Sequence, residues 1–184
     1  MSKLETNIIA PSTGTTITLG ESGDTVALGS GATQTGFGGV NTPAFQAYKS
    51  SSQSLSAGAT TKITFDSENF DTNSNYDTST SRFTPTVAGK YYLDLSLQFD
   101  INATGALLYC YAYLYKNGSN LKMSLNDFQN GNASQHNATS TFIVDMNGST
   151  DYIEAYGHIY NTGAVLASNG TAKLSVFSAY KIIE

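Results

Sequence analysis

The stretch GKYYLDLSLQFD, at residues 89–100, alternates two kinds of side chain. The apolar row is Tyr91, Leu93, Leu95, Leu97 and Phe99, and the row between them is Tyr92, Asp94, Ser96 and Gln98. Because successive side chains of a β-strand point to opposite faces, this period of two predicts a long strand with one buried face. We expect the apolar row to pack in the core of a β-sandwich.

The stretch LLYCYAYLY, at residues 107–115, has the same period. One row is Leu108, Cys110, Ala112 and Leu114, and the other is Tyr109, Tyr111, Tyr113 and Tyr115. Cys110 is the only cysteine, so no internal disulfide can form. Its position in the middle of a strand favours a small buried hydrophobe over a reactive thiol.

Shorter strand-like segments follow one another from about residue 42 onward. They lie at 44–48, 61–65, 82–84, 139–146, 152–160 and 172–182. Turn-forming pairs such as Asn117-Gly118 and Asn147-Gly148 separate them, and no helical period of useful length occurs. Many short strands with Asn-Gly turns predict an all-β sandwich or jelly roll.

Motifs in these strands come in the order of a known family. They are Pro43-Ala44-Phe45-Gln46-Ala47, Phe65, Tyr76-Asp77, Phe83, Gly89-Lys90-Tyr91-Tyr92-Leu93, Leu114-Tyr115-Lys116-Asn117-Gly118, Asp151-Tyr152-Ile153 and Phe177-Ser178-Ala179. Over residues 43–182 this order resembles the globular heads of complement C1q, which belong with the tumour necrosis factor jelly rolls. Leu93, Thr150 and Ala179 depart from the family pattern. The resemblance implies a ten-stranded jelly-roll head at residues 42–184 that forms a homotrimer.

The resemblance also implies which faces look outward. In such heads the leucine of the L-x-K-N-G motif, here Leu114, points between the sheets, which turns the tyrosines of the same strand outward. The strand at 152–160 is the expected neighbour, with Ile153, Ala155, Gly157 and Ile159 inward and Glu154 outward. We call the resulting outer surface the aromatic face, and its expected members are Tyr109, Tyr111, Tyr113, Tyr115, Tyr156, His158 and Tyr160.

Tyrosine offers a flat apolar ring and a hydroxyl, which suit stacking on sugars and hydrogen bonding to them. A large exposed aromatic cluster requires a reason, so the aromatic face is a candidate receptor or glycan site. The alternative is structural: cross-strand ring packing that stiffens the sheet, or rings covered by a loop. The same family geometry predicts a trimer interface on the other sheet, at Tyr92, Asp94, Ser96, Gln98 and Phe177.

The first forty residues differ from the rest. Ile8-Ile9-Ala10-Pro11, Ile17-Thr18-Leu19-Gly20 and Val26-Ala27-Leu28-Gly29 recur every nine residues. Each unit is too short to fold alone, so we expect a trimeric β-repeat shaft over residues 1–30, followed by a glycine-rich neck at 31–41. Its expected core is Ile8, Ile17, Leu19, Val26 and Leu28. A disordered tail is the alternative. The repeats resemble shaft segments of phage tail fibres and other virion appendages.

Composition excludes several classes of partner. The formal net charge is −5 and the nine basic residues are scattered, which argues against nucleic acid. No apolar run is long enough to span a bilayer, so no membrane insertion is expected. The N-terminal segment MSKLETNIIAPSTG has no apolar core of signal-peptide length. We therefore expect synthesis in a host cytoplasm and display on the exterior of a virion.

Catalytic and metal motifs are weak. The only histidines are His136, expected in a surface loop at 130–137, and His158, and no nucleophile elbow or H-E-x-x-H motif occurs. We expect no enzyme, no cofactor and no metal. Asp71, Asn73, Asn75 and Asp77 begin like a calcium loop, but Tyr76 stands where glycine is needed and Arg82 where the closing carboxylate is needed. Calcium there is an alternative to an ordinary loop.

The sequence thus predicts a non-enzymatic, homotrimeric fibre or knob that attaches a phage to its bacterial host. Its expected partners are a host surface glycan or protein and another virion protein bound through the N-terminal segment. One alternative is a capsid decoration protein or head fibre of the same build. An alternative of another class is a cellular carbohydrate-binding module, which needs an export route.

Overall fold

The computed structural model describes residues 9, 11–27, 30–31, 41–101, 107–128, 133–160, 164–166 and 173–182, without the side chains of residue 101 and residues 164–166. The chain divides into two units, Met1–Gly38 and Gly39–Glu184. No helix in the described part is long and apolar enough to cross a bilayer.

The described residues of the first unit contain turns and bends but no strand. A turn follows Gly20, where the Asp24 amide donates to the Glu21 carbonyl at 3.0 Å and the Asp24 carboxylate accepts from the Glu21 amide at 2.8 Å. The apolar repeat side chains Ile17, Leu19 and Val26 are exposed, while Ile8 and Leu28 lie outside the described residues. A single chain does not test the expected shaft, which stays a prediction together with the neck.

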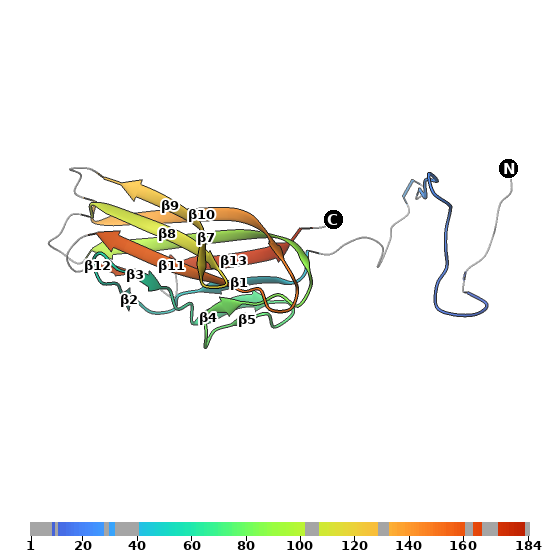
Figure 1. Ribbon diagram of the computed structural model, residues 1–184, viewed down its shortest axis with the longest axis horizontal. Helices are drawn as coiled ribbons and strands as arrows, with labels where there is room; N and C mark the ends of the chain where they lie inside the picture. Colours follow the sequence, from blue (N-terminus) through green and yellow to red (C-terminus); the bar gives the residue numbers. More distant parts are fainter. Residues whose placement is uncertain are drawn as a thin grey trace. The chain divides into compact units, whose positions relative to one another are not determined.

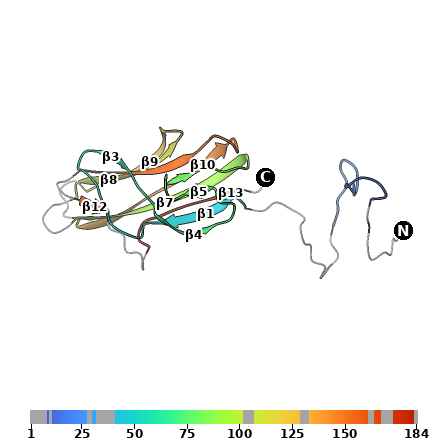
Figure 2. The ribbon, with the colours of Figure 1, turned by 90° about the horizontal axis from the view of Figure 1, so that it is seen from below.

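The second unit is a sandwich of two antiparallel sheets (Figures 1 and 2). The β7 sheet contains β2 (Gln53–Ser54), β12 (Ala164–Leu166), β7 (Gly89–Ile101), β13 (Val176–Lys181), β1 (Ala44–Tyr48) and β4 (Ser67–Asp71), with β10 (Gln135–Met146) on the other edge of β7. The β8 sheet contains β5 (Tyr76–Asp77), β6 (Arg82–Phe83), β11 (Ile153–Tyr160), β8 (Tyr109–Lys116) and β9 (Ser119–Asp127), with β3 (Thr60–Lys62) paired to β11.

The core between the sheets follows the alternation in the sequence. All five residues of the apolar row of β7 are fully buried, as are Cys110, Ala112 and Leu114 of β8. Ile153, Ala155 and Ile159 of β11, which lies beside β8, are also buried and face the β7 sheet. Burial raises the pKa of the Cys110 thiol to about 12, as expected for a buried hydrophobe. The predicted all-β sandwich is confirmed, and so are its inward rows apart from Leu108.

The strands of the structure differ from the expected ones mainly in the residue at which they begin. Residues 44–48 match, whereas β10 begins four residues earlier than expected, at Gln135, and β13 begins four later than expected, at Val176. Two strands of substantial length were not anticipated, β4 and β9.

Two predicted side-chain directions are wrong. Leu108 is exposed, because β8 begins only at Tyr109 and Leu107 takes the core position instead. Phe177, predicted at the trimer interface, is fully buried: its ring centroid lies 5.0 Å from that of Phe45 and 6.0 Å from that of Phe65. It shares the inward parity of its cross-strand partner Leu95.

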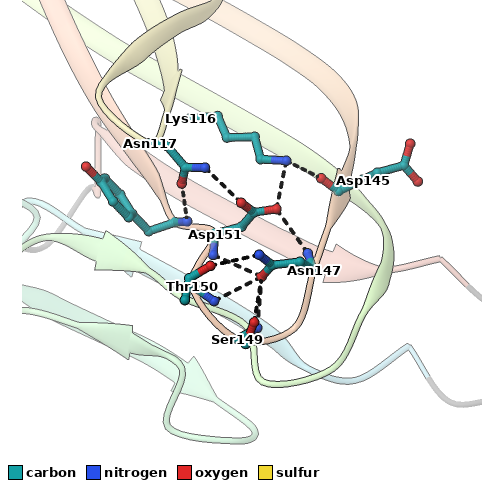
Figure 3. A network of polar contacts seen from close by, with 8 residues as sticks. Lys116, Asn117, Asp145, Asn147, Ser149, Thr150 and Asp151 are labelled. Carbon is teal, nitrogen blue, oxygen red and sulfur yellow. Dashed lines mark hydrogen bonds and ion pairs between the residues drawn. The ribbon is translucent and has the colours of Figure 1, made fainter.

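A polar network fixes one end of the β8 sheet (Figure 3). The Asn147 side-chain oxygen accepts from the amides of Ser149, Thr150 and Asp151 at 2.9, 2.9 and 3.0 Å. The Asp151 carboxylate accepts from Lys116 Nζ and Asn117 Nδ2, both at 2.8 Å. The loop after β10 is thereby bound to the turn after β8, which holds the neighbouring ends of β8 and β11 in register.

Candidate binding face

Antiparallel pairing of β8 with β11 brings the predicted aromatic face together. The register sets Tyr109 opposite Tyr160, Tyr111 opposite His158, and Tyr113 opposite Tyr156. Along β8, neighbouring tyrosine ring centroids are 5.4 to 6.0 Å apart. Across the strands, the Tyr109–Tyr160 centroids are 4.9 Å apart and the Tyr115–Tyr156 centroids 4.3 Å. All seven predicted residues therefore form one continuous layer.

The rings pack against each other and keep part of their surface in solvent. Tyr160 is 47% exposed, and the other six members are half-buried. Cross-strand packing and an accessible face thus occur together, so the structural and the binding interpretations are compatible. Thr60 of β3 contacts His158, with Oγ1 3.1 Å from Nδ1.

Strand β9 extends this surface with residues that the sequence reasoning missed. Met123 lies opposite Tyr113 and Leu125 opposite Tyr111, and these two side chains are 50% and 47% exposed. Their inward-pointing neighbours Ser124 and Asn126 are polar. Because Met123 and Leu125 face outward, the aromatic face continues to the edge of the sheet, whereas Leu121 of the same strand packs against the core. The period-two spacing of Met123 and Leu125 was the available signal.

Desolvation favours the neutral form of several aromatic side chains on this face. Desolvation raises the pKa of Tyr109, Tyr113 and Tyr156 above the ordinary tyrosine value. Desolvation also lowers the pKa of His158, which favours its neutral form. The surface therefore offers rings and hydroxyl groups rather than charges.

One end of the face holds a charged cluster around Glu154. Although its parity is outward as predicted, Glu154 is only 2% exposed. Its Oε1 accepts from Lys62 Nζ at 2.6 Å and from Arg82 Nε at 2.7 Å, and its Oε2 accepts from the Tyr156 hydroxyl at 3.1 Å. Desolvation raises the pKa of Glu154, but the hydrogen bonds from Lys62 and Arg82 outweigh it and lower the pKa overall.

The outward face of the β7 sheet carries four of the predicted interface residues: Tyr92, Asp94, Ser96 and Gln98, all half-buried. Cross-strand neighbours add Tyr180 of β13 and Ile143 of β10. A hollow of about 270 Å³ lies between β1, β4, β7 and β13 and is lined in part by Phe70, Tyr92 and Tyr180. This face has exposed apolar side chains beside a carboxylate, Asp94, whose pKa is raised by desolvation.

The histidines lie in different sheets. His136 belongs to β10 rather than to the expected surface loop, and its ring packs edge-on against Phe128 with centroids 4.7 Å apart. Its Nε2 is buried and has no hydrogen-bond partner among the described residues.

The loop at residues 71–77 is an inter-strand loop in which carboxylates bind backbone. Asp71 accepts from the Asn73 and Tyr76 amides, and Asp77 accepts from the Ser79 amide and hydroxyl. Within the described part of the chain, no three His, Cys, Asp or Glu side chains gather as a metal site.

The chain was compared with known proteins. The family model of the C1q domain matches residues 44–182. A comparison with curated protein sequences found no match. Among solved structures, the globular domain of zebrafish complement 1qA protein is similar at 14% identity and a TM-score of 0.53, covering 77% of this chain and 98% of that one.

Two further solved structures are similar as well. Eiger TNF from S. frugiperda matches at 9% identity with a TM-score of 0.58, covering 77% of this chain and 92% of that one. Murine APRIL at pH 5.0 matches at 9% identity with a TM-score of 0.57, covering 76% and 98%. At these identities the likeness establishes the fold alone. Taken with the family match over residues 44–182, it means that this chain belongs to the C1q domain family.

Proposed function

We propose that this chain is a non-enzymatic, homotrimeric virion protein that attaches a phage to its bacterial host through the aromatic face. The observation that carries the proposal is the continuous layer of six tyrosines and one histidine, extended by Met123 and Leu125. Burying apolar surface stabilises a protein by about 25 cal/mol per Å², so an apolar layer of this kind is normally buried. Its retention in solvent on a rigid sheet supports a role in binding.

Sugar chains are the ligand class that best fits this surface. The rings are neutral and provide flat apolar surfaces for stacking, and their hydroxyls and the His158 ring provide hydrogen bonds. The nine-residue repeats of the N-terminal unit support the virion context, because their exposed apolar side chains require other chains to cover them. In this proposal the N-terminal unit attaches the head to another virion protein.

Replacing Tyr111 and Tyr113 together with serine should lower binding of the labelled protein to host cells by at least about tenfold. Two central aromatic contacts are lost, and such contacts are each worth roughly 2 kcal/mol in a binding site. Flow cytometry measures the binding. The matched control is Val87→Ser, an exposed apolar residue away from the face. Unchanged adsorption by the double variant would show that this face is not the receptor site.

Domains of this family are often trimeric, and we expect the trimer here to form through the outward face of the β7 sheet. Tyr180→Glu places a charge beside the apolar hollow, and burying an unpaired charge costs roughly 3 kcal/mol or more. We expect light scattering to find three chains per particle for the native protein and single chains for this variant. Tyr160→Glu, on the aromatic face, is the control and should stay trimeric. A native monomer would contradict the proposal.

A capsid decoration protein or head fibre would have the same trimeric build, and a cellular carbohydrate-binding module could use the same aromatic face. Labelling purified virions with an antibody against residues 42–184 separates these functions. Label at the tail tip supports a tail fibre, and label over the capsid supports a decoration protein. Particles without label would remove the virion context and leave the carbohydrate-binding module.

A further inference from the structure

Arg82 lies at the end of the aromatic face that holds the Glu154 cluster. Strand β6 pairs with β11 through Phe83 and Ile153, both buried. The preceding residue of β6, Arg82, therefore shares the outward side of the β8 sheet with Glu154 and Tyr156. Its guanidinium belongs to the same surface as the rings.

The guanidinium is held in place from two sides. Nε donates to Glu154 Oε1 at 2.7 Å, and Cζ lies 4.1 Å from the centroid of the Tyr152 ring. Glu154 is itself fixed by Lys62 and by the Tyr156 hydroxyl. An arginine stacked on an aromatic ring and bonded at Nε loses little further freedom when it binds a ligand.

The terminal edge of the guanidinium is unused. No described residue accepts a hydrogen bond from either Nη atom, and the side chain is 42% exposed. The two Nη groups form a planar fork that matches the two oxygens of a carboxylate. Glu154 and Asp77, the cross-strand partner of Arg82, together balance the charges of Lys62 and Arg82. The neighbouring acid, Asp77, directs its carboxylate to Ser79 and Thr80 at 2.7 Å.

We propose that the Nη edge of Arg82 is a carboxylate-binding subsite of the aromatic face, so that the sugar chain bound there contains an acidic sugar. This inference rests on the proposed glycan binding. The rings of Tyr115 and Tyr156, 4.3 Å apart, lie next to the cluster and supply the stacking surface for that sugar. An acidic peptide would also satisfy the fork, but it would not use the row of rings along β8.

Paired glycans test this subsite on the full-length protein. Oligosaccharides that contain hexuronic or sialic acid are immobilised beside the same oligosaccharides with the carboxyl group reduced to a primary alcohol. At low ionic strength, at least one acidic glycan should bind about tenfold more tightly than its reduced partner, the effect of one charge-assisted hydrogen-bonded pair. This difference should shrink as salt is added.

Substitutions assign the preference to Arg82. Arg82→Met should abolish the preference, so that the two glycans of a pair bind equally, and Arg82→Lys should retain only part of it. Lys122→Met, which removes an exposed charge from β9, should leave the preference intact. Equal binding of every acidic and reduced pair would overturn the subsite, and this comparison needs no variant. A preference that survives in Arg82→Met, or tighter binding of a glutamate-rich peptide than of any acidic glycan, would also overturn it.

The proposed function fails in a different way. If Tyr111→Ser with Tyr113→Ser leaves binding to both glycans of a pair unchanged, the aromatic face is not the glycan site. If that double variant loses both glycans while the native protein binds them equally, the aromatic face stands and the Arg82 subsite is wrong.

Discussion

Replacing Phe177 with alanine lowers the free energy of unfolding by about 3–5 kcal/mol, the usual cost of removing a fully buried aromatic ring. The ring joins the two sheets, because it contacts Phe45 of the β7 sheet and Tyr76 of the β8 sheet. Urea denaturation at a fixed protein concentration measures the loss, since assembly also contributes to stability.

Leu174→Ala is the control for Phe177. Leu174 lies just before the same strand, but its side chain is partly exposed, so we expect a loss below about 1 kcal/mol. A Phe177→Ala protein that keeps its stability and dissociates into monomers would contradict the buried position and restore Phe177 to the interface.

Gly148→Ala is expected to cost about 3 kcal/mol or more. Gly148 has a φ of +69°, which a residue with a Cβ adopts at a cost of roughly 1 kcal/mol. A Cβ there would also lie 2.3 Å from the Ala88 amide nitrogen and 2.7 Å from the Val87 carbonyl carbon. Both are backbone atoms, so the turn before β7 or the loop after β10 must shift, at a cost typical of overpacking.

Gly58→Ala separates the two contributions. Gly58 has a similar φ, +76°, with no atom near the position of a Cβ, so it reports the backbone cost alone, about 1 kcal/mol. Equal losses of unfolding free energy in the two variants would show that the loop around Gly148 moves at no cost to accommodate the Cβ. The polar network of Asn147 and Asp151 would then not hold this loop rigidly.

Sequence periodicity predicted the local direction of side chains well. The alternation from Tyr91 to Phe99 and from Cys110 to Leu114 needs only the pleat of a strand, and both rows are buried as expected. The pattern fails where a strand ends. Leu108 continues the period in the sequence, but the pairing with β9 begins at Tyr109, so the parity no longer applies to Leu108.

Long-range partners set the limits of such a prediction. Glu154 is buried because Lys62 from β3 and Arg82 from β6 meet it, residues 92 and 72 positions away. In β13, Val176 and Tyr180 are apolar as well as Phe177, so composition does not decide which row faces the core; pairing with Leu95 does. Strand β9 escapes prediction for a similar reason, since Met123 and Leu125 face outward beside the tyrosines while Leu121 packs against the core.

The buried position of Cys110 has a practical consequence. Its sulfur is the only thiol in the chain and lies between the sheets, where the thiolate is strongly disfavoured. A maleimide dye should therefore react much faster at a cysteine introduced on the surface than at Cys110. In the native protein, the slow rate at which Cys110 is modified measures how often the sandwich opens.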